Sequence, residues 1–223
     1  MTDLVNPANG WGVLHLFCQP APSFDGDSVV IAVKAVEAAG HQVVAASMLG
    51  HKADFGFMAV GPDLRVLRRF QSALQTAGLR IVDSYVSLTE VSEYAKGMPA
   101  EMIESRLHPK LPPAGKSAFC FYPMSKRRNA GQNWFTLPYE QRDELMREHG
   151  KSGRTFAGRV VQVVTGSTGL DDREWGVTLF GVHLDDHKQL VYTMRFDEAS
   201  ALYAEFGPFF TGIVTPVEEL VAG

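Results

Sequence analysis

Cysteines and long apolar runs are scarce in this sequence. Its 223 residues contain only two cysteines, Cys18 and Cys120, each in an apolar segment and without CxxC spacing. Such cysteines are typical of small core side chains, not of a disulfide framework or a zinc site. No stretch near either end reaches the roughly 18 apolar residues that a membrane-spanning helix needs. The first residues also carry no basic segment of the secretory type, so we expect a cytoplasmic protein without membrane insertion.

Motifs for nucleotide binding and for common hydrolases are also missing. The sequence has no GxGxxG between a strand and a helix, no GxxxxGKS/T, no HExxH and no GxSxG, which argues against those classes. The net charge of -4, from 21 basic and 25 acidic residues, does not favour a nucleic-acid binder. Acidic residues are absent between Arg106 and Tyr139, a stretch with six basic side chains: Arg106, Lys110, Lys116, Lys126, Arg127 and Arg128. This stretch predicts a site for an anion.

The hydrophobic pattern repeats along the chain. Hydrophobic residues make up 45% and charged residues 21% of the sequence, which are the proportions of a folded globular chain. Each half predicts a strand, a helix, two strands, a helix and a strand. The predicted ranges are 11–18, 29–39, 41–48, 55–60, 61–78 and 79–91, then 117–124, 138–149, 159–165, 174–180, 185–203 and 206–214. Gly40, Gly78 and Gly150 are expected to end three of the helices.

This duplication predicts an α+β fold, in which two ferredoxin-like βαββαβ repeats form a dimeric α+β barrel within one chain. The expected units are a structural N-terminal repeat at 1–96, a connecting segment at 97–115 and a C-terminal repeat at 116–223. Helices cover only one face of each predicted sheet, so we expect the other face to pack against the sibling sheet. A ligand is expected in a cavity between a sheet and its helices.

His149 allows two interpretations. It follows a strongly charged helical segment and stands directly before Gly150. A histidine in the last turn of a helix is favoured by the helix dipole, and from these residues alone that explanation is preferred. The alternative is a neutral imidazole that a rigid helix end presents to a metal or cofactor.

Six short sequence motifs, which occur in a fixed order, favour the second interpretation. They are FYPMSKRR at 121–128, NWFxLP at 133–138, HGxxGR at 149–154, GSxGxDD at 166–172, EWGVTLF at 174–180 and MRFDExS at 194–200. Together they resemble the signature of the coproheme decarboxylases, which are hydrogen-peroxide-dependent haem synthases of the chlorite dismutase superfamily. The similarity covers most of residues 106–212, and the first half resembles the family mainly in layout. The resemblance implies that the C-terminal repeat binds haem and carries the catalysis.

The resemblance also implies roles for matching positions. It makes His149 the axial ligand of the haem iron. Tyr122 would be the tyrosine that becomes a radical and abstracts hydrogen from a propionate, and Lys126 the lysine that assists the second decarboxylation. A phenol can lose and regain a hydrogen atom, and an ammonium group can donate a proton nearby. The period of two along a strand places Tyr122, Met124 and Lys126 on one face.

The remaining implied positions surround the substrate. They are Arg106, Met124, Gln162, Arg195 and Ser200. Met124, Arg195 and Ser200 would line the propionates, and Gln162 would lie on the distal side of the ring, where true chlorite dismutases carry an arginine. Arg106 would take the place of a propionate-binding arginine, since His108 stands close to that position. We interpret His108 first as a loop residue and second as a distal base, and Trp134 and Trp175 first as packing residues.

The implied activity is oxidative decarboxylation of two propionates of iron-coproporphyrin III to vinyl groups. Coproheme would be both substrate and redox cofactor, hydrogen peroxide the oxidant and haem b the product. The resemblance implies a homo-oligomer, commonly a pentamer. Two alternatives remain open: a non-catalytic haem carrier or sensor, and a haem peroxidase of the chlorite dismutase type. Gln162 disfavours chlorite chemistry, because an amide lacks the fixed positive charge that an arginine offers to an oxyanion.

Overall fold

The computed structural model describes residues 5–223 of the chain. Its first half contains β1 (Gly12–Pro20), α1 (Gly26–Ala38), β2 (Gln42–Met48), β3 (Phe55–Gly61), α2 (Leu64–Thr76) and β4 (Leu79–Thr89). This order confirms the predicted βαββαβ unit. Asp25 and Asp63 cap the two helices by accepting backbone N–H groups with their side chains, as N-cap residues do. The chain leaves both helices through glycines with positive φ, Gly40 at 78° and Gly78 at 82°.

The second half repeats the unit with additions. Helix α3 (Ala100–Leu107) lies in the connection, and the repeat itself contains β5 (Ala118–Lys126), α4 (Tyr139–Arg154), β8 (Val160–Gly166), β9 (Trp175–Gly181), α5 (Leu184–Met194), α6 (Glu198–Ala201), β10 (Ala204–Phe206) and β11 (Phe210–Val214). Between β5 and α4 are a small hairpin, β6 (Arg128–Asn129) and β7 (Gln132–Asn133), and the 3-10 turn η1 (Trp134–Thr136). Helix α7 (Val217–Ala222) ends the chain. The sequence pattern had not predicted α3, the hairpin or α7.

Three predicted elements differ from the structure by more than a small shift of their ends. Helix α4 continues past Gly150 to Arg154, because Gly150 keeps a helical conformation and the chain ends the helix at Thr155, whose hydroxyl donates to the Ser152 carbonyl at 2.7 Å. His149 therefore lies inside the helix and not in its last turn. The predicted helix 185–203 is split into α5 and α6, because Asp197 caps a new helix. The predicted strand 206–214 is split into β10 and β11, whose ends flank Gly207, Pro208 and Phe209.

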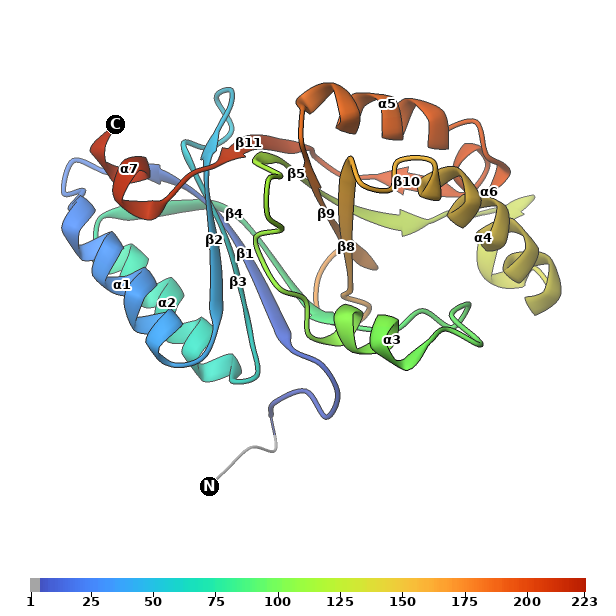
Figure 1. Ribbon diagram of the computed structural model, residues 1–223, viewed down its shortest axis with the longest axis horizontal. Coiled ribbons are helices and arrows are strands. Elements are labelled where there is room, and N and C mark those ends of the chain that lie inside the picture. Colours follow the sequence, from blue (N-terminus) through green and yellow to red (C-terminus); the bar gives the residue numbers. More distant parts are fainter. Residues whose placement is uncertain (1–4) are drawn as a thin grey trace.

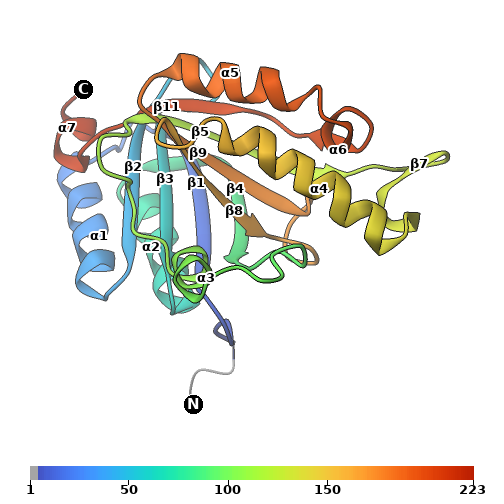
Figure 2. The same cartoon turned by 45° about the vertical axis from the view of Figure 1, so that its right-hand side comes forward.

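All strands except β6 and β7 form one closed sheet. Its order is β10-β5-β11-β2-β3-β1-β4-β8-β9, and an additional pairing of β9 with β5 closes a ring of eight strands, with β10 continuing the line of β11 along β5. The two halves join through the antiparallel pairs β11–β2 and β4–β8. Helices α1, α2 and α7 lie at one end of the molecule and α4, α5 and α6 at the other (Figure 1, Figure 2). The predicted dimeric α+β barrel is confirmed.

The layer between sheet and helices differs between the two halves. In the first half, 19 buried apolar residues fill this layer, among them Phe57, Phe70 and Leu220 of α7. In the second half the corresponding cluster contains only six, including Tyr122 and Leu190. The interior of the barrel is a third cluster, rich in phenylalanine. Side chains therefore fill the layer between sheet and helices in the first repeat, whereas the same layer in the second repeat has room for a ligand.

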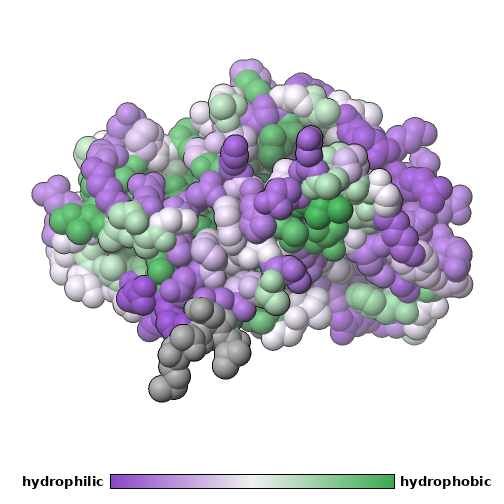
Figure 3. Space-filling model, turned by 60° about the horizontal axis from the view of Figure 1, so that its bottom comes forward, coloured by the Kyte–Doolittle hydropathy of each residue, from purple (hydrophilic) through white to green (hydrophobic). Residues whose placement is uncertain are grey.

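The surface is mainly hydrophilic on the face shown in Figure 3, with apolar side chains in smaller groups. None of the helices in the described part of the chain is long and apolar enough to cross a membrane. The division of the chain at residues 96 and 115 stays a prediction.

Candidate active site

A cavity lies on the outer face of the second half of the barrel. Strand pairing places Tyr122 opposite Val177 and Met124 opposite Trp175, so these side chains share one face of the sheet. Tyr122, Met124 and Lys126 all line the cavity, which confirms the predicted common face of that strand. Strand β8 extends this floor with Gln162 and Val164, and both also line the cavity.

Three helices form the roof. Helix α4 contributes Met146 and His149, the α5 region contributes Met194 and Arg195, and α6 contributes Ser200. The cavity encloses about 950 Å³ of space between atoms, including its open mouth. Most of the lining is apolar or aromatic with a few polar groups, which is typical of a site for a small organic ligand.

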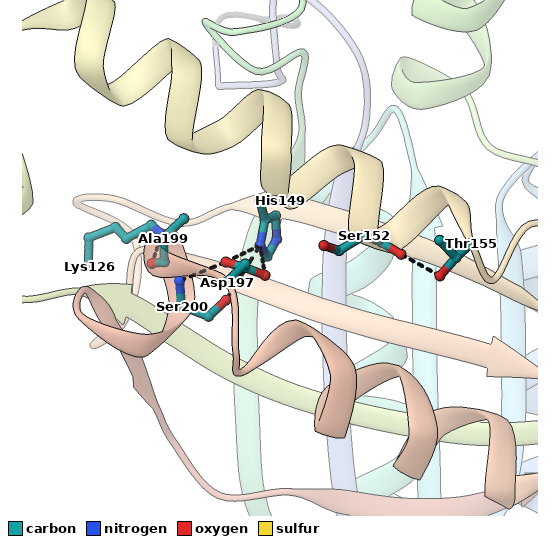
Figure 4. Close-up of polar contacts among 7 residues, drawn as sticks. All are labelled: Lys126, His149, Ser152, Thr155, Asp197, Ala199 and Ser200. Carbon is teal, nitrogen blue, oxygen red and sulfur yellow. Dashed lines mark hydrogen bonds and ion pairs between the residues drawn. The ribbon is translucent and has the colours of Figure 1, made fainter.

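His149 is held by a carboxylate on the neighbouring helix (Figure 4). Its Nδ1 lies 3.2 and 3.1 Å from the two carboxylate oxygens of Asp197. The Ser200 backbone N–H donates to Asp197 at 3.0 Å, and the Ser200 hydroxyl lies 3.4 Å from His149 Nδ1. Burial alone would raise the pKa of the Asp197 carboxyl, but hydrogen bonding to His149 and the charge of that ring outweigh it and lower the pKa.

This arrangement fits a metal-binding histidine. When Nδ1–H donates to Asp197, the lone pair of the imidazole is on Nε2, the nitrogen without a hydrogen bond among the described residues. Histidines that bind metals commonly donate their other N–H to a carboxylate, which orients the ring and strengthens it as a ligand. No group of three His, Cys, Asp or Glu suited to a metal occurs in residues 5–223. His149 would therefore suit a metal that takes one nitrogen from the chain because other atoms already hold it, as a porphyrin does.

Lys126 is a buried cation at the cavity wall. Its Nζ donates to the Ala199 carbonyl at 2.7 Å and lies 4.2 Å from the centre of the Trp134 ring. Burial lowers the pKa of Lys126 to about 8, while the charges of Asp197 and Glu174 act in the opposite direction. An ammonium group with this pKa can donate a proton near neutral pH.

Tyr122 is enclosed by aromatic rings. Its ring stacks on Phe209 at 4.5 Å between centroids and meets the edge of Phe206 at 5.5 Å. Burial raises the pKa of the Tyr122 phenol above its usual range. Tyr122 therefore presents a neutral O–H group at the cavity.

The other predicted substrate-binding residues fall into two groups. Met124, Gln162, Arg195 and Ser200 line the cavity, and the Arg195 guanidinium stacks 4.2 Å from the Tyr192 ring. Arg106 is exposed on α3 and does not line the cavity. No contact in the structure therefore supports its predicted role in binding a propionate.

His108 lies away from the cavity. It bonds Glu104 at 2.7 Å and packs on Trp11 at 4.8 Å between rings. These contacts agree with the loop interpretation over the distal-base interpretation.

The stretch without acidic residues, 106–139, does not form a single anion site. Of its six basic residues, only Lys126 lines the cavity. Arg128 pairs with Glu174, and Lys116 donates to the Gly158 carbonyl at 2.7 Å. The second cation at the cavity, Arg195, comes from another part of the chain.

The sequence did not identify Asp197 as a site residue, and it did not show that Trp134 and Trp175 line the cavity. The Asp197-x-x-Ser200 spacing is a helix N-cap pattern and could have predicted that a new helix begins after Asp197, but it carries no sign that Asp197 lies beside His149. Trp134 is buried in a small core cluster, as predicted, and also touches Lys126. Trp175 is only half-buried and forms part of the cavity wall, so the packing interpretation was wrong for this residue.

Comparison with known proteins defines the class. The family model described as "Chlorite dismutase" matches residues 27–215. The chain therefore belongs to the chlorite dismutase family, whose members include the coproheme decarboxylases.

Particular relatives agree with this assignment. The chain is 36% identical to a structure described as a novel heme-binding protein from Thermus thermophilus, with a TM-score of 0.86 over 99% of this chain and 98% of that one. A mutant chlorite dismutase from Candidatus Nitrospira defluvii is 22% identical, with a TM-score of 0.76 over 97% and 96% of the two chains. The same organism's chlorite dismutase in complex with imidazole is also 22% identical, with a TM-score of 0.76 over 97% and 95%. At this identity the likeness to the two chlorite dismutases is one of fold.

Proposed function

We propose that this protein is a peroxide-dependent coproheme decarboxylase that converts iron-coproporphyrin III to haem b. For each of two propionates, the reaction is R–CH2–CH2–COO⁻ + H2O2 + H⁺ → R–CH=CH2 + CO2 + 2 H2O. The propionate side chain is oxidised by two electrons, and peroxide is reduced to water. Coproheme is the substrate and supplies the redox chemistry with peroxide when bound.

One observation carries the proposal: a single cavity brings Tyr122, Lys126 and His149 to its surface from β5 and α4. His149, oriented by Asp197, would hold the iron through Nε2. Tyr122 would lose a hydrogen atom and take one from the propionate carbon. Lys126, with its lowered pKa, would deliver a proton at the second propionate.

The charges of the cavity support an anionic substrate. Arg195 and Lys126 are cations at a largely apolar wall, whose acidic side chain Glu93 lies 3.7 Å from Arg142, and charge-assisted hydrogen bonds to carboxylates are strong. Ser200 adds a hydroxyl and Met124 an apolar contact. Gln162, on the strand that forms the opposite part of the floor, offers an amide to the distal face of the ring.

Replacement of Tyr122 by phenylalanine tests the proposal. Tyr122→Phe keeps the stacked ring and removes the hydroxyl that lets this residue cycle between phenol and phenoxyl. Coproheme should still bind, and after addition of peroxide mass spectrometry should find all four propionates unreacted. Conversion to haem b at the wild-type rate would show that Tyr122 is not the relay.

Lys126→Ala is the matched variant on the same strand face. It removes a proton donor but no redox group, so the first propionate should still react. A three-propionate product should accumulate in the mass spectrum. If both variants give the same products, the separate roles assigned to Tyr122 and Lys126 are wrong.

The alternatives predict other outcomes in the same assay. A haem carrier or sensor would leave the mass of coproheme unchanged in the wild-type protein. A chlorite-decomposing enzyme would release oxygen rapidly from chlorite, and Gln162 makes us expect little release at an oxygen electrode. A propionate contact of Arg106 and a pentameric assembly stay proposals that follow from the resemblance, and a cytoplasmic location stays a proposal that follows from the sequence pattern.

A further inference from the structure

Glu90 contacts the cavity wall from the other half of the chain. It directly follows β4, in the N-terminal half, and its Oε1 accepts the indole N–H of Trp175 at 3.1 Å. Trp175 is the first residue of β9 and lines the cavity. The hydrogen bond therefore crosses the β4–β8 seam and joins the first half of the barrel to the site in the second.

Gly166 makes room for this contact. It ends β8 and pairs with Trp175 in the sheet. A Cβ atom on Gly166 would overlap the Glu90 carboxylate. Gly166 is not among the glycines with positive φ, so its backbone conformation does not require glycine. A side chain at Gly166 would therefore displace the Glu90 carboxylate from its position beside the indole.

The Glu90 carboxylate has no basic partner among the described residues. The nearby acidic residue Glu93 differs, because its carboxylate lies 3.7 Å from Arg142. Burial raises the pKa of Glu90, and the hydrogen bond from Trp175 acts in the opposite direction. Glu90 is itself exposed, and the indole N–H is the side-chain donor in the described residues that holds its carboxylate beside Trp175.

We propose that Glu90 is a positioning residue that holds the Trp175 ring in place as a preformed wall of the cavity. Strand pairing sets Trp175 beside Met124, with Val177 two residues further on the same face. A free indole can rotate about two side-chain torsions, whereas one bonded at Nε1 keeps its ring beside these neighbours. A wall fixed before binding lowers the ordering cost for a flat macrocycle. This inference rests on the proposed porphyrin substrate, but its first test needs no porphyrin.

The first test observes the indole N–H groups of the full-length protein. With ¹⁵N-labelled tryptophan, Trp11, Trp134 and Trp175 give three indole signals, and Trp175→Phe identifies one of them. In Glu90→Ala this signal should move upfield and its proton should exchange faster with water. Glu90→Gln retains an amide oxygen as acceptor and should restore much of the wild-type position. Glu93→Ala, the matched control, should leave the signal in place. An unmoved signal in Glu90→Ala would overturn the proposal.

The second test measures binding of iron-coproporphyrin by absorbance titration. Glu90→Ala should weaken binding about fivefold, equivalent to about 1 kcal/mol, and Glu90→Gln should restore most of it. In a Trp175→Phe background, Glu90→Ala should cause no further loss. An equal loss in both backgrounds would show that Glu90 acts independently of Trp175. Because neither readout is turnover, a protein that binds coproheme without decarboxylating it would refute the proposed function and leave this inference intact.

Discussion

At the scale of single residues, the bond from His149 to Asp197 decides which ring nitrogen is available. Nδ1 is engaged by the carboxylate, so ligand binding falls to Nε2. Asp197 is itself held by the Ser200 backbone N–H. The position of the ring is thus set by two helices, α4 and α6, that meet only in the folded protein.

Removal of the carboxylate should weaken binding of the iron. Asp197→Ala should reduce the affinity for iron-coproporphyrin by about 10- to 100-fold, and His149→Ala should shift the absorption bands of the bound porphyrin, while propionate contacts retain the ring. Both are measured by absorbance titration. Glu198→Ala, an exposed neighbour on α6, is the control and should bind normally. Unchanged bands in His149→Ala would rule out His149 as the axial ligand.

Lys126 should make stability depend on pH. Burial lowers its pKa from 10.5 to about 8 in the folded protein, so between these values the unfolded chain binds more protons, and the free energy of unfolding rises with pH. Below pH 8 both states are protonated and the cost of burying the charge is present in full. Relative to Lys126→Met, the wild-type protein should gain about 2 kcal/mol between about pH 7.5 and pH 10. Urea denaturation of both proteins measures the difference, and parallel pH profiles would contradict a lowered pKa.

At the scale of elements, α7 shows that the C-terminal end of the chain stabilises the opposite half. Its residues Val217 and Leu220 belong to the core between α1, α2 and the first-half strands. The cavity lies under α4, α5 and α6, at the other end of the molecule (Figure 1). Stability and ligand binding are therefore carried by different helices.

Leu220→Ala should separate these two properties. Truncation of a buried leucine costs about 2–4 kcal/mol of unfolding free energy, because the cavity left between α7 and α1 does not fully collapse. Affinity for iron-coproporphyrin should not change. Ile31→Ala, at a position on α1 that is 67% exposed, should cost less than about 0.5 kcal/mol. Weakened porphyrin binding in Leu220→Ala would show that the two ends of the molecule are coupled.

At the scale of the whole molecule, closure of the sheet leaves neither repeat complete by itself. Strand β2 of the first half pairs with β11, and β4 pairs with β8. Separation of the halves would expose these strand edges and the phenylalanine-rich interior of the barrel. The shared interior predicts that the two repeats unfold together.

A single cooperative transition is therefore expected in urea. Emission from Trp11 in the first half, recorded in a Trp134→Phe/Trp175→Phe variant, should give the same midpoint as far-ultraviolet circular dichroism. Emission from the two second-half tryptophans, recorded in Trp11→Phe, should also coincide with the dichroism of that variant. Two separated midpoints would mean that the halves unfold independently.

The sequence by itself determined the repeated order of strands and helices and the common face of Tyr122, Met124 and Lys126. These features depend on local periodicity, on capping aspartates such as Asp63 and on glycines such as Gly78, all of which act within a few residues. Its signature words also identified the superfamily. The ends of the elements depended on tertiary contacts as well. Helix α4 continues through Gly150, because packing on α5 and α6 outweighs the weak helix propensity of one glycine.

Only the tertiary structure decided which side chains meet. Asp197 reaches His149 across 48 residues and Glu90 reaches Trp175 across 85, and neither pair has a local signature. Arg106, by contrast, lies on a helix that the pattern did not predict and makes no contact with the cavity. The physical reason is that sheet closure and helix packing bring together residues that are distant in the chain, whereas periodicity reports only the face on which each residue lies.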